Sequence, residues 1–315
     1  MLNRKIISAF LLIIYFLSAI FINLSNSLAI ENGELSLGDN VVTFVKRMGE
    51  NGPITFGPVC SAGVIGPRIV ATAKHCLQEF NNGDSNLVDK TFEVTFPGSD
   101  LRNNNFKSAK ILNFIASSGD FRSTEDIALV LVDKDLPIQK NVKVATLEDL
   151  ARFKEAEVTV FTLGYGANAD SNAQSLLPYK LQSTFTKSLP FSPISPQTLY
   201  FKYQSKLSYI CGGDSGGPNY VIEQDTAFYV AATGFATRPG CAKGIVGEFY
   251  SGGNSLAYFP ELIKSAEEQV KLQKVLTDKP IIVNVKITCT KGKLIKYVVG
   301  KNPKCPSGYK LETKK

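Results

Sequence analysis

The sequence predicts an all-β protein, a barrel or a sandwich, that carries a small separate module at its C-terminus. Short apolar or alternating runs such as TFEVTF and DIALVLV are cut by Gly, Pro and Asn clusters between residues 41 and 236, a pattern typical of many short strands. One long helical pattern occurs late, at residues 258–276, and residues 281–315 differ in composition from the rest. We therefore expect strands to form the body of the protein.

The first 29 residues have the features of a secretory signal peptide. Arg4 and Lys5 precede an apolar run of 17 residues at 6–22, and the small residues Ser27 and Ala29 follow at the spacing of a signal-peptidase site. A retained membrane anchor is the alternative, although a span needs about 20 apolar residues. We expect cleavage after Ala29 and a protein that is either secreted and extracytoplasmic or associated with the cell surface.

Two segments of the remaining chain are predicted to be helical. Residues 146–155 would bridge two groups of strands, which fits a domain over 30–280 built from two β-units, about 30–150 and 151–280. The second segment, 258–276, has a rough apolar stripe formed by Leu262, Ala266, Val270 and Leu276.

Residues 281–315 are predicted to form a small β-hairpin module, because two alternating strands, VNVKITC and KLIKYVV, flank a KGK turn. Nine Lys and one acidic residue, Glu312, give this tail a charge of +8, whereas residues 30–280 carry −3. The body is therefore not basic, and we expect no nucleic-acid binding. The tail fits either docking on an anionic cell wall, membrane or polymer, or a solvated hairpin without a partner.

Six cysteines are expected to form three disulfides, because an exported chain meets oxidising conditions. Their spacing suggests that neighbours in the sequence pair: Cys60 with Cys76, Cys211 with Cys241, and Cys289 with Cys305. A disulfide is the expected staple of a tail too short to bury a large core. No C-x-x-C occurs, so a zinc or redox motif is not expected.

The only histidine of the chain, His75, lies in TAKHC beside a cysteine. Metal sites built on imidazole normally recruit several His or Cys ligands, whereas catalysis by one His needs a nucleophile and an orienting carboxylate. A nucleophile is offered by CGGDSGGP, residues 211–218, where glycines around Ser215 allow a tight turn with converging backbone N–H groups. A Gly-rich surface turn is the alternative.

Three blocks together resemble the trypsin-like (chymotrypsin-fold) serine proteases. CSAGVIGPRIVATAKHC, DIALV and GGDSGGP follow the family's order His, Asp, Ser, with separations of 51 and 89 residues. The resemblance covers about residues 30–270 and implies two six-stranded antiparallel β-barrels, no metal or cofactor, and protein or peptide substrates. A monomer is expected. The tail is similar to short Lys-rich two-Cys modules of some exported bacterial proteins, which assigns no activity.

The resemblance implies a role for each residue of these blocks. Ser215 would be the nucleophile, and His75 would be its base and later the acid for the leaving amine. Asp126 would hold the imidazole in the useful tautomer. The backbone N–H groups of Gly213 and Ser215 would form the oxyanion hole. A catalytically decayed binding or adhesion protein on the same scaffold is the alternative to a serine endopeptidase.

The resemblance also places residues around this site. Tyr209, six residues before the nucleophile, would lie at the base of the primary specificity pocket, and a tyrosine cannot neutralise a buried Arg or Lys. The first two disulfides would brace the His loop and the pocket wall. Cleavage after Ala29 would expose Ile30, whose α-amino group would pair with Asp214 beside the nucleophile. The alternative is that Ile30 is a frayed terminus.

Overall fold

The computed structural model describes most of the chain, and all structural statements below concern these residues: 30, 32–48, 52, 54–56, 59–77, 88–119, 125–167, 175–190, 195–237, 246–278, 285–292, 294–300 and 303–312. The expected signal peptide and Cys241 lie outside the described residues.

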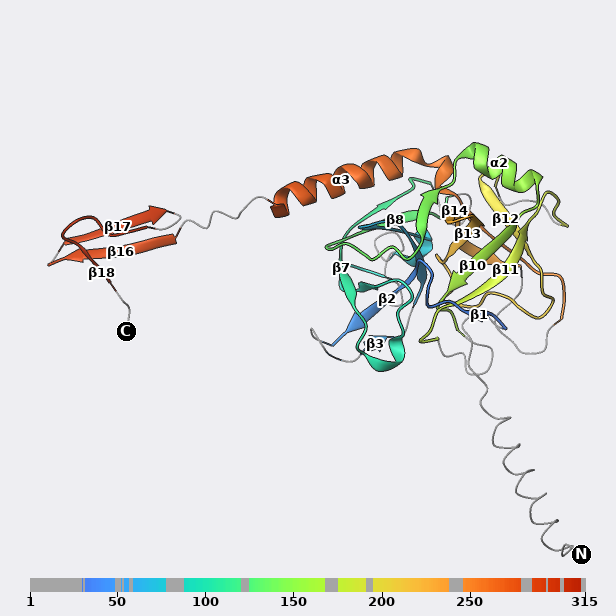
Figure 1. Ribbon diagram of the computed structural model, residues 1–315, viewed down its shortest axis with the longest axis horizontal. Coiled ribbons are helices and arrows are strands. Elements are labelled where there is room, and N and C mark those ends of the chain that lie inside the picture. The colour runs from blue at the N-terminus through green and yellow to red at the C-terminus, as the bar shows by residue number, and fades with distance from the viewer. Residues whose placement is uncertain are drawn as a thin grey trace, which may run out of the picture. The chain divides into compact units, whose positions relative to one another are not determined.

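Six antiparallel strands close the first β-barrel (Figure 1). Around the barrel they are β2 (Val41–Arg47), β4 (Ser61–Gly66), β5 (Ile69–Thr72), β8 (Ala128–Val132), β7 (Ser108–Ala116) and β6 (Glu93–Thr95). β6 pairs back with β2, and a short strand, β3 (Ile54–Phe56), extends β2. Because alternate residues of a strand face the same side, the alternating apolar positions of these strands share one buried core, which includes Val42, Phe44, Ala62, Val64 and Val130.

A second six-stranded barrel follows the same principle. Its order is β11 (Tyr179–Phe185), β10 (Thr159–Gly164), β13 (Pro218–Glu223), β14 (Thr226–Ala236), β15 (Tyr250–Asn254) and β12 (Thr198–Tyr203), and β12 pairs back with β11. Two further strands join its outside: β1 (Glu34–Leu35) on β11, and β9 (Asn141–Val144), parallel, on β14. The expected pair of barrels is therefore confirmed.

Two α-helices accompany the barrels. α2 (Leu147–Glu155) begins with a capping box, in which the Thr146 hydroxyl accepts from the Asp149 N–H and the Asp149 carboxylate accepts from the Thr146 N–H. The late helix, α3, spans Pro260–Asp278, slightly later than expected, because a 3₁₀ turn, η4 (Leu256–Tyr258), precedes it. No helix in the described part of the chain is both long and apolar enough to cross a membrane.

The C-terminal residues form a second compact unit, which is divided from the first between Glu267 and Glu268, inside α3. Its sheet has the order β17 (Leu294–Gly300), β16 (Val285–Lys291), β18 (Lys310–Leu311). The expected hairpin is β16 and β17. The third strand, β18, is too short to show an alternating pattern in the sequence, and the disulfide Cys289–Cys305 holds the segment before it to β16.

Candidate active site

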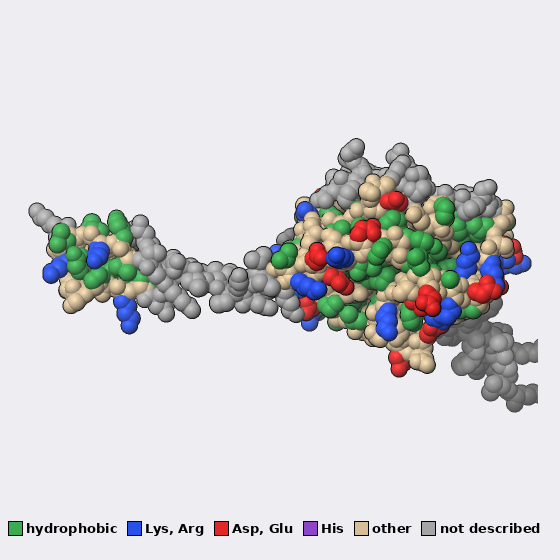
Figure 2. Space-filling model, turned by 90° about the horizontal axis from the view of Figure 1, so that it is seen from above, with side chains coloured by type: hydrophobic (Ala, Val, Ile, Leu, Met, Phe, Trp, Pro, Cys, Tyr) green, Lys and Arg blue, Asp and Glu red, His purple; other side chains and the backbone are tan. Residues whose placement is uncertain are grey.

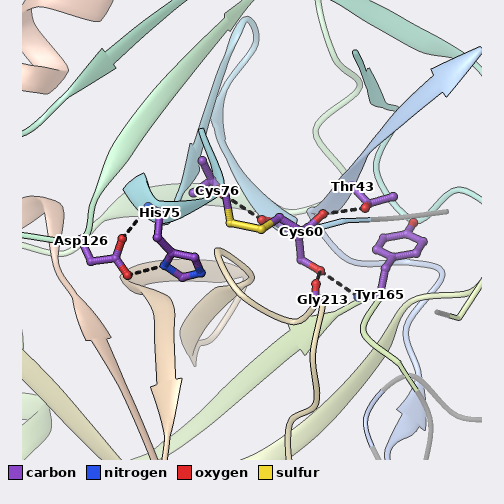
Figure 3. The surroundings of a disulfide bond; sticks show 9 residues. Thr43, Cys60, His75, Cys76, Asp126, Tyr165 and Gly213 are labelled. Carbon is purple, nitrogen blue, oxygen red and sulfur yellow. Dashed lines mark hydrogen bonds and ion pairs between the residues drawn. A yellow bond between two sulfur atoms is a disulfide. The ribbon is translucent and has the colours of Figure 1, made fainter. Parts of the chain in front are cut away.

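His75 and Asp126 meet because their strands are neighbours. β5 and β8 run antiparallel, and Thr72 at the end of β5 lies opposite Ala128 near the start of β8. His75 follows β5 in a 3₁₀ turn, η1 (Lys74–Cys76), and Asp126 lies two residues before the start of β8. The turn after one strand and the residue before its neighbour therefore come together at the same edge of the first barrel, where Figure 3 shows the carboxylate facing the imidazole ring.

The Asp126 carboxylate holds His75 through two hydrogen bonds. One oxygen lies 2.7 Å from the imidazole Nδ1, and the other accepts from the His75 backbone N–H at 2.9 Å. The carboxylate is nearly buried, whereas the His75 side chain is 27% exposed. Because an ionised carboxylate only accepts, Nδ1 carries the proton, and the basic lone pair of the neutral ring lies on Nε2.

Asn254 is a second partner of Asp126 that the sequence did not indicate. Its side-chain oxygen accepts from the Asp126 backbone N–H at 3.1 Å, and the residue is 4% exposed at the end of β15. The second barrel thus holds a residue of the first. No spacing or motif in the sequence around Asn254 marks this contact, because the two residues are 128 positions apart.

Ser215 lies in the glycine-rich turn between β12 and β13. Gly213 has φ +92°, a conformation that favours glycine. The turn is closed by two backbone hydrogen bonds, from Asp214 N–H to Cys211 C=O and from Gly217 N–H to Asp214 C=O. Among the described residues, the N–H groups of Gly213 and Ser215 have no hydrogen-bond acceptor. Both donors are therefore available to a ligand.

This turn packs directly against the strand that leads to His75. A methyl group placed on Gly216 would lie 2.0 Å from the Thr72 hydroxyl oxygen and 2.9 Å from the Ala73 nitrogen. The expected nucleophile and the expected base thus belong to one site, and a hydrogen bond between such groups often tightens only when substrate binds.

Asp214 is completely buried, and its carboxylate accepts hydrogen bonds of 2.8 Å from the N–H groups of Cys211 and Gly166. Burial raises the pKa of this carboxyl to about 7, against the opposing effect of the two hydrogen bonds. A Cβ on Gly164 or Gly166 would come within 2.0 Å or 2.5 Å of the carboxylate. The carboxyl group therefore occupies space that only two glycines leave open.

Ile30 is also fully buried, in a hydrophobic cluster that contains Tyr179, Tyr209 and Cys211. Its carbonyl accepts a 2.8 Å hydrogen bond from the Gly33 N–H, which turns the chain toward β1. The same Cys211 donates its N–H to Asp214. Ile30 thus lies in the cluster that adjoins the buried carboxylate, rather than at a frayed surface end.

A disulfide lies beside His75, and it decides whether the cysteines there can bind a metal ion. Cys60 is bonded to Cys76, and the expected partner of the disulfide-bonded Cys211, Cys241, lies outside the described residues. The ligand atoms of Cys60, His75 and Cys76 lie within 4.8 Å of one another. Because both sulfurs are in a disulfide, neither is a thiolate that can bind a metal ion, so this cluster braces the His75 turn.

A cavity of about 160 Å³ opens beside Ser215. The described residues of its wall include no acidic or basic side chain; they are Ile210, Cys211, Gly212, Ser215, Thr233, Phe235 and Ala236. Tyr209 is not part of this wall. It is 1% exposed and packs edge-on against Phe249, with ring centroids 6.2 Å apart. The expected base of the pocket therefore lies behind it, in the core.

A larger cavity of about 590 Å³ lies elsewhere, against α2 and β12, and is lined in part by Leu147, Phe185, Tyr200 and Tyr258. It contains none of the residues that the sequence assigned to catalysis. The larger cavity therefore does not mark the candidate site. The smaller cavity does, because Ser215 forms part of its wall.

A family model described as Trypsin matches residues 42–257. This span runs from β2 to η4 and includes both barrels, the His75–Asp126 pair and the turn around Ser215. It covers more than half of the chain and ends before α3 and the C-terminal module.

Replacing Asp126 with Asn is expected to lower kcat by about 10⁴-fold with little change in fold, because the amide no longer enforces the tautomer that is protonated on Nδ1. Peptide hydrolysis and circular dichroism of the purified variant measure the two effects. The control is Asp135→Asn, whose carboxylate is 60% exposed and pairs with Arg68 away from the site. A wild-type kcat in the Asp126 variant would contradict the assigned role.

Proposed function

The chain belongs to the trypsin family, and from this we propose that it is an exported serine endopeptidase acting through Ser215, His75 and Asp126. The observation that supports this best is the juxtaposition of a carboxylate-held imidazole with a serine turn in which two N–H groups have no acceptor among the described residues. Nucleophile, base and oxyanion donors are the parts that acyl transfer requires.

In the proposed reaction, His75 Nε2 takes the Ser215 hydroxyl proton as the serine oxygen attacks the scissile carbonyl carbon. The electron pair of the C=O bond moves to oxygen, where the N–H groups of Gly213 and Ser215 stabilise it. The imidazolium, stabilised by Asp126, then protonates the leaving amine as the C–N bond breaks. Water repeats these steps on the acyl-enzyme and regenerates the serine.

The alternative is a decayed protease fold that only binds. A fluorophosphonate probe distinguishes the two, because it reacts with an activated serine and not with a binding surface. The protein starting at Ile30 is expected to be labelled, and Ser215→Ala is expected to abolish labelling. Mass spectrometry of the labelled peptide gives the site. Absence of labelling in the native protein, or labelling that survives Ser215→Ala, would disprove the proposal that the protein is a serine endopeptidase acting through Ser215.

Specificity is expected to favour small or medium apolar residues at P1, because the cavity beside Ser215 is small and its described wall is uncharged. A P1 Arg or Lys would bury its charge there without an opposite charge. A peptide library cleaved by the enzyme and read by mass spectrometry measures the preference. Dominant cleavage after Arg or Lys would contradict this prediction.

Activation is proposed to occur when signal cleavage frees the Ile30 α-amino group to pair with Asp214. The folded pKa of Asp214, about 7, lies above its ordinary value of 3.8. Ionisation of this carboxyl therefore destabilises the folded turn. The destabilisation grows as the pH rises from about 4 to about 7, where it reaches about 4 kcal/mol. A buried cationic partner would offset that penalty. Its own pKa, ordinarily ~7.7 to 8.0, would be raised by the carboxylate.

The protein starting at Ile30 is expected to be active at neutral pH and to lose activity reversibly at alkaline pH. The amine is fully charged below its ordinary pKa, and the ion pair is lost as the pH rises through the raised one. A variant with one extra residue before Ile30 should lose most activity while staying folded. N-terminal sequencing, pH–rate profiles and near-UV circular dichroism measure these effects. Equal activity of the extended form would refute the ion pair.

We also propose that the C-terminal module holds the enzyme on an anionic surface. Its described lysines Lys291, Lys296, Lys304 and Lys310 are exposed. Leu294, Ile295 and Tyr297 are about 60% exposed beside them. Figure 2 shows these two kinds of side chain mixed on the module, whereas acidic and basic side chains alternate on the body. The tail carries +8 and the body −3, so only the tail is expected to attract an anionic surface.

Deleting residues 281–315 is expected to leave peptide hydrolysis nearly unchanged and to reduce binding to anionic vesicles or anionic polymer beads. Binding of the full chain should weaken with salt, because exposed charges are screened. Sedimentation at low and high salt measures binding, with neutral vesicles as the control. Loss of peptidase activity on deletion would show that the tail belongs to the catalytic fold.

A further inference from the structure

Ser61 lies between the two barrels and belongs to none of the groups assigned above. It is the first residue of β4, follows the disulfide-bonded Cys60, and is 0% exposed. β4 is part of the first barrel, yet the hydrogen-bond partners of the Ser61 N–H and hydroxyl groups lie in the second. A buried hydroxyl at this junction must be satisfied by specific partners.

Both polar ends of Ser61 contact the turn around the nucleophile. Its backbone N–H donates to the Ser215 carbonyl at 2.8 Å, and its hydroxyl donates to the Gly213 carbonyl at 2.9 Å. The hydroxyl oxygen also accepts from the Tyr165 N–H at 2.9 Å. Figure 3 shows Gly213 and Tyr165 close together beside Cys60. One hydroxyl thus connects two segments of the second barrel.

The bond to Gly213 restrains a plane of the backbone. A peptide unit is planar, so fixing its C=O also fixes the N–H on the other side. In the Gly213–Asp214 unit the oxygen is held by the Ser61 hydroxyl and the N–H by the Cys211 carbonyl at 3.1 Å. Glycine allows many backbone conformations, so a fixed plane after Gly213 limits the directions available to the Gly213 N–H.

We propose that Ser61 is a positioning residue for the oxyanion hole. Its hydroxyl holds the Gly213 carbonyl so that the Gly213 N–H stays directed at the substrate oxygen. A hydroxyl suits this place because it donates to a carbonyl and accepts from an N–H at once. Alanine would leave both the Gly213 carbonyl and the Tyr165 N–H without this partner. This inference rests on the proposed protease function.

The test compares Ser61→Ala with Thr43→Val in the protein starting at Ile30. Thr43 lies opposite Ser61 in the β2–β4 pairing, is also fully buried, and donates its hydroxyl to the Cys60 carbonyl at 2.7 Å. Thr43→Val thus removes a buried hydrogen bond in the same pair of strands. That bond goes to Cys60 and not to the serine turn. Ser61→Thr keeps the hydroxyl and serves as the rescue variant.

Ser61→Ala is expected to lower kcat at least tenfold with KM within threefold of wild type, since loss of a whole oxyanion donor reduces kcat by about 10²–10³. Affinity for a peptide boronate, which forms a tetrahedral adduct, should fall by the same factor as kcat/KM. Thr43→Val should keep both within about twofold, and Ser61→Thr should recover most of the loss. Thermal unfolding of each variant measures the structural effect separately.

Amide hydrogen exchange gives a readout that does not require activity. The amides of Gly213 and Asp214 should exchange faster in Ser61→Ala than in Thr43→Val at equal stability. Unchanged kcat, boronate affinity and exchange in Ser61→Ala would overturn the proposal, as would equal losses in both variants. A wild-type protein that fails to react with a fluorophosphonate would refute the protease function instead, and the exchange comparison would still decide the role of Ser61.

Discussion

The complete withdrawal of the Asp214 carboxyl from water is the constraint on which the shape of the serine turn depends. A buried carboxyl needs donors, and it finds them in the N–H groups of Cys211 and Gly166. These bonds join the start of the turn to the end of β10. Ser215, the next residue, is thereby held in a turn whose first residue, Cys211, is fixed to the buried carboxylate. The geometry of the serine turn thus depends on Asp214, whose side chain is buried.

Hydrogen bonds across the boundary between the barrels place the groups of the proposed site relative to one another. The first barrel supplies the imidazole and its carboxylate, and the second supplies the serine turn. Asn254 of the second barrel holds the Asp126 backbone, and Ser61 of the first holds the backbone of Gly213 and Ser215. Each barrel thus fixes a functional element of the other, so that small shifts between barrels would disturb both halves of the site together.

The architecture could be predicted because its signals are local, and the proposed site residues also rest on local signals. Alternation within strands predicts the barrels, and His75, Asp126 and Ser215 lie in short motifs whose order resembles a known family. Ser61 and Asn254 could not be found in this way, since their partners are more than 100 residues distant and any buried polar residue fits such a place in the sequence. Tyr209 was located by offset alone, and packing against Phe249 puts its ring behind the cavity rather than in its wall.

The space around the Asp214 carboxyl has a consequence for how this sequence can diverge. Gly164 ends β10, and Gly166 follows two residues later. Even alanine at either position would overlap the carboxylate or force the turn to move. Gly164 and Gly166, which are not among the proposed reacting groups, are therefore expected to tolerate substitution as poorly as the proposed nucleophile. In a library of random variants under selection for function, their pattern of tolerance would match that of reacting residues, although their contribution is only the volume they leave empty.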